Sequence, residues 1–85
     1  MLTRLEASNL EEATKAAWKV MFDNEDQVKI LRNARGEFFA GTHEQVDLLD
    51  IEMGHGKFAE EYSVLGVLIP KGGFISYPVP SAAVE

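Results

Sequence analysis

The segment from Val64 to Val79 constrains the fold of this chain more than any other stretch. Two runs rich in aliphatic, β-branched and aromatic residues, VLGVLI and FISYPV, are separated by Pro70-Lys71-Gly72-Gly73. Proline presets the first position of a turn and glycine tolerates positive φ, so the segment predicts a β-hairpin. The first run is apolar on both faces, which is typical of a central strand covered by other elements. The remaining residues must supply that cover.

The first covering element is an amphipathic helix. Ser8-Asn9-Leu10-Glu11 has the form of a capping box, with Ser8 as the expected N-cap. From Leu10 to Phe22 the apolar residues recur at helical spacing and predict about four turns. Trp18 lies at the margin of the apolar face, where it is either a border of the core or an exposed aromatic anchor for a partner. The polar segment 23–26 ends the helix, because short polar side chains favour turns.

Residues 27–41 predict a second hairpin. Asn33-Ala34-Arg35-Gly36 suits a type I turn, with asparagine at its first position and glycine at its last. The flanking runs carry Val28 and Ile30 before the turn, and Phe38 with Phe39 after it.

Residues 42–53 allow two interpretations. Thr42 with Gln45 repeats the capping-box form and Gly54 is placed for a helix end, which together favour a helix of about three turns. Leu48 and Ile51, however, lie across the helix from Val46, and 49–53 alternates as a strand would. Residues 57–63 then form a short helical turn or the start of a long strand.

We therefore predict a small single α+β domain over residues 1–80, followed by a mobile tail at 81–85. Two hairpins form an antiparallel sheet of about four strands, the N-terminal helix packs on one face, and the order is α-β-β-α-β-β. The alternative is one helix against a five-stranded meander. The expected core consists of Leu10, Ala17, Met21, Val28, Ile30, Phe38, Val67, Ile69, Phe74 and Ile75.

Composition narrows the classes of function. The chain has no cysteine, so thiolate metal sites, thiol nucleophiles and a disulfide scaffold are excluded. It shows no apolar run long enough for a membrane span and no signal-peptide core, which indicates a cytoplasmic location by default. The net charge of −6 argues against direct binding to nucleic acid or to an anionic membrane. Residues 42–63 hold six carboxylates against one lysine, and hence most of that imbalance.

The sequence contains no catalytic or cofactor motif, and a chain this short leaves little room for a cleft of ~300 Å³ or more. We therefore expect a protein that is not an enzyme and needs no cofactor. The two histidines lie in the acidic segment, where imidazole and carboxylate groups together suggest a metal half-site. Its candidate ligands are His43, Asp47, Asp50 and His55.

The leading functional prediction is a small acidic protein-binding module, an inhibitor or adaptor, that engages a basic surface through residues 42–63. A sharper version, drawn from charge alone, is a phage-type inhibitor of a nucleic-acid-binding enzyme whose carboxylates imitate phosphates. The expected partner-binding residues are Glu44, Asp47, Asp50, Glu52, His55, Glu60, Glu61 and Trp18.

Two further hypotheses come from other classes. One is a structural subunit that forms homo-oligomers through strand edges or through the Trp18 and Phe22 margin. The other is a metal-binding or ligand-binding protein that uses His43 and His55.

Overall fold

The computed structural model describes residues 2–77, which form three helices and one five-stranded sheet. The predicted α+β class is confirmed, with an additional strand before the first helix and an additional helix before β4. The end of the predicted hairpin at residues 78–79 and the predicted tail at 81–85 fall outside the described residues. In chain order the elements are β1 (Thr3–Leu5), α1 (Leu10–Asn24), β2 (Val28–Asn33), β3 (Phe38–Thr42), α2 (His43–Met53), α3 (His55–Glu61), β4 (Tyr62–Ile69) and β5 (Gly73–Ser76).

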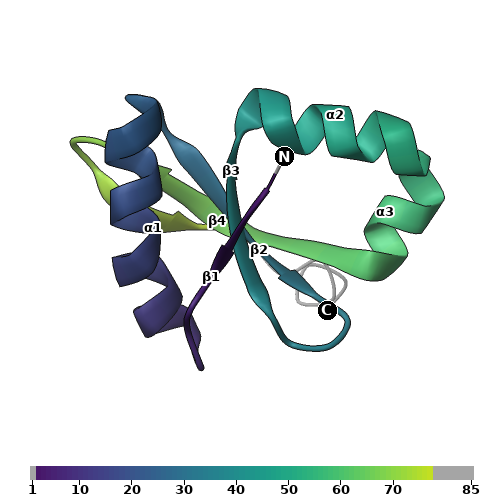
Figure 1. Cartoon of the computed structure of the whole chain (residues 1–85), viewed down its shortest axis with the longest axis horizontal. Coiled ribbons are helices and arrows are strands. Elements are labelled where there is room, and N and C mark those ends of the chain that lie inside the picture. The colour runs from purple at the N-terminus through teal and green to yellow at the C-terminus, as the bar shows by residue number, and fades with distance from the viewer. Residues whose placement is uncertain (1, 78–85) are drawn as a thin grey trace.

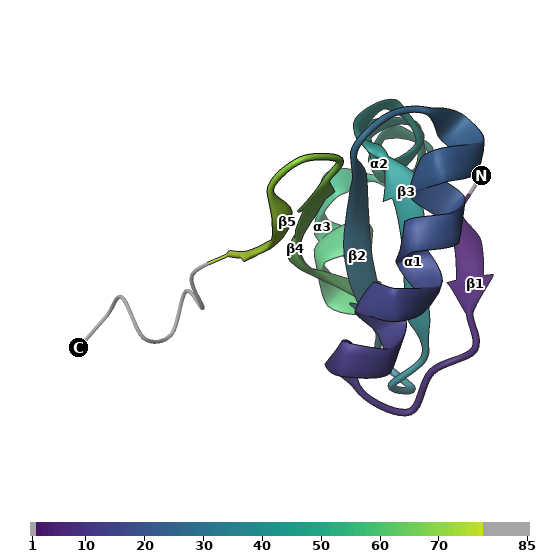
Figure 2. The ribbon, with the colours of Figure 1, turned by 90° about the vertical axis from the view of Figure 1, so that its left-hand side faces the viewer.

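The sheet is antiparallel throughout, with the strand order β1-β3-β2-β4-β5. Both predicted hairpins are confirmed: β2 pairs with β3, and β4 pairs with β5 through a turn in which the Gly72 N–H donates to the Ile69 carbonyl at 3.2 Å. The middle strand is β2, so β4 is an interior strand but not the central one. Figure 2 shows β5 at the edge of the sheet opposite β1.

The β2–β3 turn is built on one asparagine. The Gly36 N–H donates to the Asn33 carbonyl at 3.0 Å, and Gly36 has a φ of 86°, a value that favours glycine. The Asn33 side-chain oxygen accepts from the N–H groups of Arg35 and Glu37, and its amide donates to the Glu37 carboxylate at 2.8 Å. This last hydrogen bond, helped by the guanidinium groups of Arg35 and Arg4, lowers the pKa of Glu37 below its ordinary value.

Helix caps decide where α1 and α2 begin. The expected Ser8 cap on α1 is wrong by one residue, because Asn9 is the N-cap and its side chain accepts from the Glu12 N–H at 2.9 Å. The Glu12 carboxylate in turn accepts from the Ser8 N–H at 2.8 Å, so asparagine, an equally good cap, completes a similar reciprocal pair. In α2 the Thr42 and Gln45 capping box forms as predicted, and the ambiguous segment is a helix.

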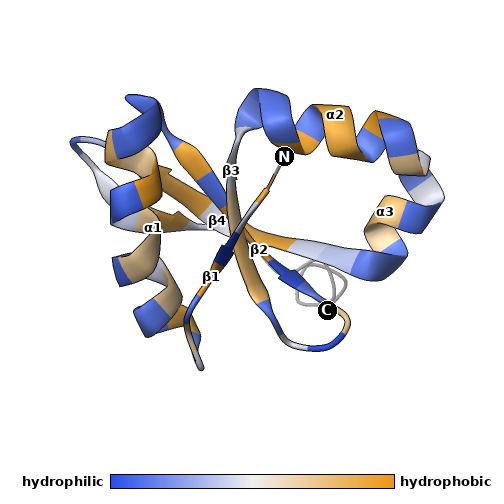
Figure 3. Ribbon diagram, in the orientation of Figure 1, coloured by the Kyte–Doolittle hydropathy of each residue, from blue (hydrophilic) through white to orange (hydrophobic). Residues whose placement is uncertain are grey.

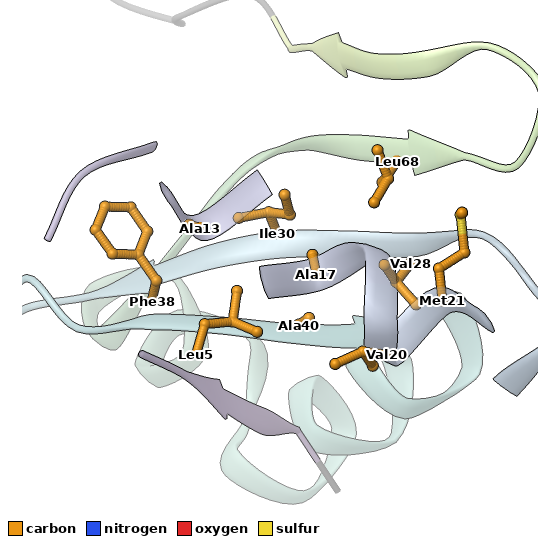
Figure 4. Close-up of a cluster of buried hydrophobic side chains, with 10 residues drawn as sticks. All are labelled: Leu5, Ala13, Ala17, Val20, Met21, Val28, Ile30, Phe38, Ala40 and Leu68. Atoms are coloured by element: carbon orange, nitrogen blue, oxygen red, sulfur yellow. The ribbon is translucent and has the colours of Figure 1, made fainter. Parts of the chain in front are cut away.

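Helices cover both faces of the sheet (Figure 1), with α1 on one side and α2 and α3 on the other. Under α1 lies the larger core, whose side chains Figure 4 shows converging from the helix and the strands. This first core consists of Leu5, Ala13, Ala17, Val20, Met21, Val28, Ile30, Phe38, Ala40 and Leu68. Under α2 and α3 lies a smaller core of Leu31, Val46 and Phe58, bordered by half-buried apolar residues.

A β-bulge in β4 determines which of its side chains pack in each of the two cores. Ile30 on β2 pairs with Gly66, but the next residue, Leu31, pairs with Val64, so Leu65 has no partner on β2. Side chains alternate along a strand, and one extra residue reverses that alternation. Val64 therefore packs with the smaller core, whereas Leu65 packs with the larger one. The run is apolar on both faces because helices cover both faces of the sheet, so β4 side chains on each side meet a core.

The expected core is correct for most of its members. Leu10, Ile69 and Phe74 are only half-buried, and Ile75 is wrong, because 48% of it is exposed on the edge strand β5. An edge strand lacks the neighbour that would complete its cover.

Candidate functional site

Helix α2 exposes apolar side chains on its outer surface. Val46 is buried against the sheet, while Leu48 and Ile51 are 56% and 76% exposed. Residues three apart lie on the same side of a helix, so Leu48 and Ile51 form one apolar strip about a turn long. In Figure 3 orange segments of α2 alternate with blue ones. The helix is therefore not a simple amphipathic cover for the core.

A groove of about 460 Å³ lies beside α2. One wall comes from the helix, and the floor comes from the start of the chain and from strands β3 and β4. The lining residues are Leu2, Phe39, Gln45, Leu48, Leu49, Glu52 and Tyr62. The expectation that so short a chain leaves little room for a cleft of ~300 Å³ or more is wrong, because the groove between α2 and the sheet exceeds that volume.

Aromatic rings hold the floor of the groove in place. Phe39 meets Tyr62 edge to face with 5.8 Å between ring centroids, and Tyr62 stacks on the buried Phe58 at 5.4 Å. Such pairs add stabilisation beyond the area they bury. Leu2 lies over Gly41, where a Cβ atom would come within 2.5 Å of a Leu2 methyl group. The floor is a packed surface that exposes hydrophobic atoms.

The structure separates the predicted acidic residues into groups. Glu44, Asp47 and Glu52 are exposed on α2, and Glu52 also lines the groove. On α3, Glu60 is exposed and Glu61 is half-buried. Four of the six carboxylates in residues 42–63, these three and Asp50, belong to the helix that carries the apolar strip.

Asp50 has a different environment. Its side chain is 30% exposed and accepts from His55 Nδ1 at 3.3 Å, which ties α2 to α3. Its other oxygen is buried and has no hydrogen-bond partner among the described residues. Asp50 is therefore a residue of the α2–α3 junction as well as of the acidic segment.

The histidines form two separate pairs. His43 Nε2 lies 3.0 Å from the Asp47 carboxylate, while His55 pairs with Asp50. Within residues 2–77, no group of three or more His, Asp or Glu side chains is arranged to hold a metal ion. The four proposed ligands are thus not brought together.

The two glycines beside His55 have different roles. Gly54, with a φ of 91°, separates α2 from α3, and its N–H donates to the Asp50 carbonyl at 3.0 Å. Gly56 lies inside α3, where an added Cβ would meet nothing within 4 Å. His55 starts a helix, and its imidazole is exposed.

Trp18 lies away from the groove. It is half-buried on α1, which covers the opposite face of the sheet, and it stacks on Phe22 with 5.7 Å between centroids. Phe22 is 68% exposed. The Trp18 and Phe22 margin is therefore a second surface, separate from the acidic segment with which it was grouped.

The groove residues Leu2, Phe39 and Tyr62 were not predicted as site residues. They come from three distant parts of the chain, so no local pattern links them. One signal was present: Leu48 and Ile51 stand opposite Val46 on the helix, where an apolar residue has no core to enter.

No family model, no curated protein and no solved structure matches this chain. None of the helices in the described residues has the length and apolar character needed to cross a bilayer.

Proposed function

We propose that this protein is a small protein-binding module that engages a basic partner through α2 and the groove beside it. One observation carries the proposal: the exposed apolar strip of Leu48 and Ile51 adjoins an open apolar groove and lies among exposed carboxylates. Contiguous exposed apolar surface with a polar rim is characteristic of interaction sites.

The charge of the chain supports a basic partner. Residues 42–63 carry most of the net charge of −6, and Asp47 and Glu52 border the apolar strip. A concentrated negative field attracts a positive surface and raises the rate of encounter. Apolar contact then supplies the affinity that exposed charges alone do not give.

The mixture of residue types favours a protein partner that uses apolar contacts over simple phosphate imitation. A mimic of a nucleic-acid backbone presents carboxylates to a basic surface built for phosphates. Here Leu48 and Ile51 interrupt the carboxylates on α2. An inhibitor of a nucleic-acid-binding enzyme remains compatible with the proposal if that partner also offers apolar side chains.

Capture from a lysate of the source cells, followed by mass spectrometry and titration of the purified partner, tests the proposal. The Asp47→Lys and Glu52→Lys double variant reverses two exposed charges and leaves Asp50 in its junction. We expect its affinity to fall about tenfold or more at low salt and its salt dependence to flatten.

The matched control is Glu6→Lys with Asp23→Lys. It makes the same change in net charge at exposed positions outside residues 42–63. We expect the control to bind like the unchanged protein. The proposal fails if no basic protein is enriched, or if the Asp47→Lys and Glu52→Lys variant binds the captured partner as tightly as the control does.

A second candidate function is self-assembly. The exposed Phe22 ring stacked on Trp18, and the exposed Ile75 on the edge strand β5, favour it. Sedimentation velocity over a range of protein concentrations tests this function. A sedimentation coefficient that rises with concentration and returns to the monomer value in Phe22→Ser supports assembly through α1, whereas a constant monomer value rules assembly out.

A further inference from the structure

The outer surface of α2 resembles one half of a two-helix seam. Leu48 and Ile51 are three residues apart, and Asp47 and Glu52 immediately flank them in sequence. In a heptad this spacing places the apolar pair at the a and d positions and the carboxylates at the neighbouring g and e positions. In coiled coils the a and d side chains pack against a partner helix, while e and g pair with its charges.

The groove extends that strip toward the sheet. Leu48 belongs to both features, because it is 56% exposed and also lines the groove with Leu2, Phe39 and Tyr62. An occupant lying along α2 would contact Ile51 on one flank and the aromatic floor on the other. The eleven residues of α2 give the helix a length of about 16 Å, of which the apolar strip covers about one turn.

Charge discriminates among the possible occupants. A second copy of this chain would oppose its own Asp47 and Glu52 to like charges, which is unfavourable at a helix seam. An extended peptide would add to the edge of β1, yet β1 has only three residues and provides few free backbone groups. A helix with lysine or arginine beside its apolar seam satisfies both the strip and the carboxylates.

We infer that the groove beside α2 binds an amphipathic helix with basic flanks, supplied by another protein. This inference rests on the proposed function and specifies the partner. The apolar side chains of the bound helix pack on Leu48, Ile51 and the floor of the groove. Its basic side chains pair with Asp47 and Glu52 at the rim.

A model peptide tests the inference. The probe contains only leucine and lysine, with leucine at a and d and lysine elsewhere, and has capped termini; a scrambled peptide of the same composition keeps the charge but not the seam. Binding is followed by calorimetry and by the gain in helical circular dichroism. We expect the heptad peptide to bind at least about tenfold more tightly than the scrambled one, a difference of about 1.4 kcal/mol.

Variants locate the peptide on the protein. Leu48→Ser with Ile51→Ser removes the apolar strip from exposed positions, and we expect it to weaken binding of the heptad peptide about tenfold or more. Phe22→Ser is the matched control, since it removes an exposed apolar side chain from the opposite layer, and we expect it to leave binding unchanged. Thermal melts of each variant confirm that the fold is retained.

Equal binding of the two peptides would overturn the inference while leaving an electrostatic protein-binding module in place. The inference would also be overturned if a captured partner needs Asp47 and Glu52 for binding but does not compete with the heptad peptide. An equal loss of binding in Phe22→Ser would also overturn it, because the peptide would then not recognise α2 specifically. Failure of the charge-reversed variant to affect partner capture is a separate result, and it concerns the proposed function.

Discussion

Replacing Ile30 with alanine should lower the free energy of unfolding by about 3–5 kcal/mol, the upper part of the range for a buried aliphatic truncation. Ile30 is fully buried on the middle strand. Its partners on the adjacent strands are Ala40 and Gly66, and Figure 4 shows Ala13 and Ala17 of α1 beside it. These neighbours are too short to fill the space that the substitution leaves, so most of the cavity remains.

Ile51→Ala is the control for that prediction. It removes the same atoms from a side chain that is 76% exposed, and we expect a change within about 0.5 kcal/mol. Urea denaturation of both variants measures the difference. If Ile30→Ala costs less than about 1.5 kcal/mol, α1 does not close on the sheet as described.

Replacing Gly66 with alanine should cost about 2–3 kcal/mol, because the strand has no room for a side chain there. An added Cβ would overlap the backbone carbonyl of Ile75 and lie 2.6 Å from Cζ of Phe74. The phenyl ring can turn aside, but the carbonyl belongs to the β4–β5 ladder, so β5 must move. Loss of β5 protection in hydrogen exchange would accompany the lower stability.

Gly72→Ala tests whether this effect comes from space or merely from the loss of a glycine. An added Cβ at position 72 meets only the Ile69 side chain, at 3.6 Å or more. The substitution restricts the unfolded chain, and we expect a neutral effect or a gain of about 0.4–1 kcal/mol. Similar destabilisation by the two substitutions would contradict the close approach of β5 to Gly66.

Local signals predicted much of the fold. The Asn33 turn, the Thr42 and Gln45 capping box, and the end of α2 at Gly54 all depend on groups within four residues of one another. Patterns of this kind are visible in the sequence, because the partners that satisfy each N–H lie nearby. The Asn9 cap shows the limit: two good capping residues in succession leave the position uncertain by one.

The two elements that were not predicted as such, β1 and α3, depend on tertiary contacts. β1 has three residues and exists through pairing with β3, while the short helix α3 is anchored by the buried Phe58. Neither is long enough to show a clear period. The Leu65 bulge is also non-local, since it depends on how β4 registers against β2.

The candidate site was also predictable only in part. Its charge could be predicted, because carboxylates in residues 42–63 can be counted. Its shape could not, because Leu2, Phe39 and Tyr62 meet only when β1, β3 and β4 take their places in the sheet. The pairing of Asp50 with His55 could not be predicted either, because it depends on α3, and the sequence did not decide whether that helix forms.

The position of Leu2 affects how the protein can be joined to anything else. Leu2 lines the groove at the β1 side of the sheet, whereas β5 lies at the opposite edge. A tag, fusion or surface linkage placed ahead of Leu2 therefore emerges beside α2 and competes for the space where a partner would dock. Attachment that follows β5 starts from the far edge and leaves the groove accessible.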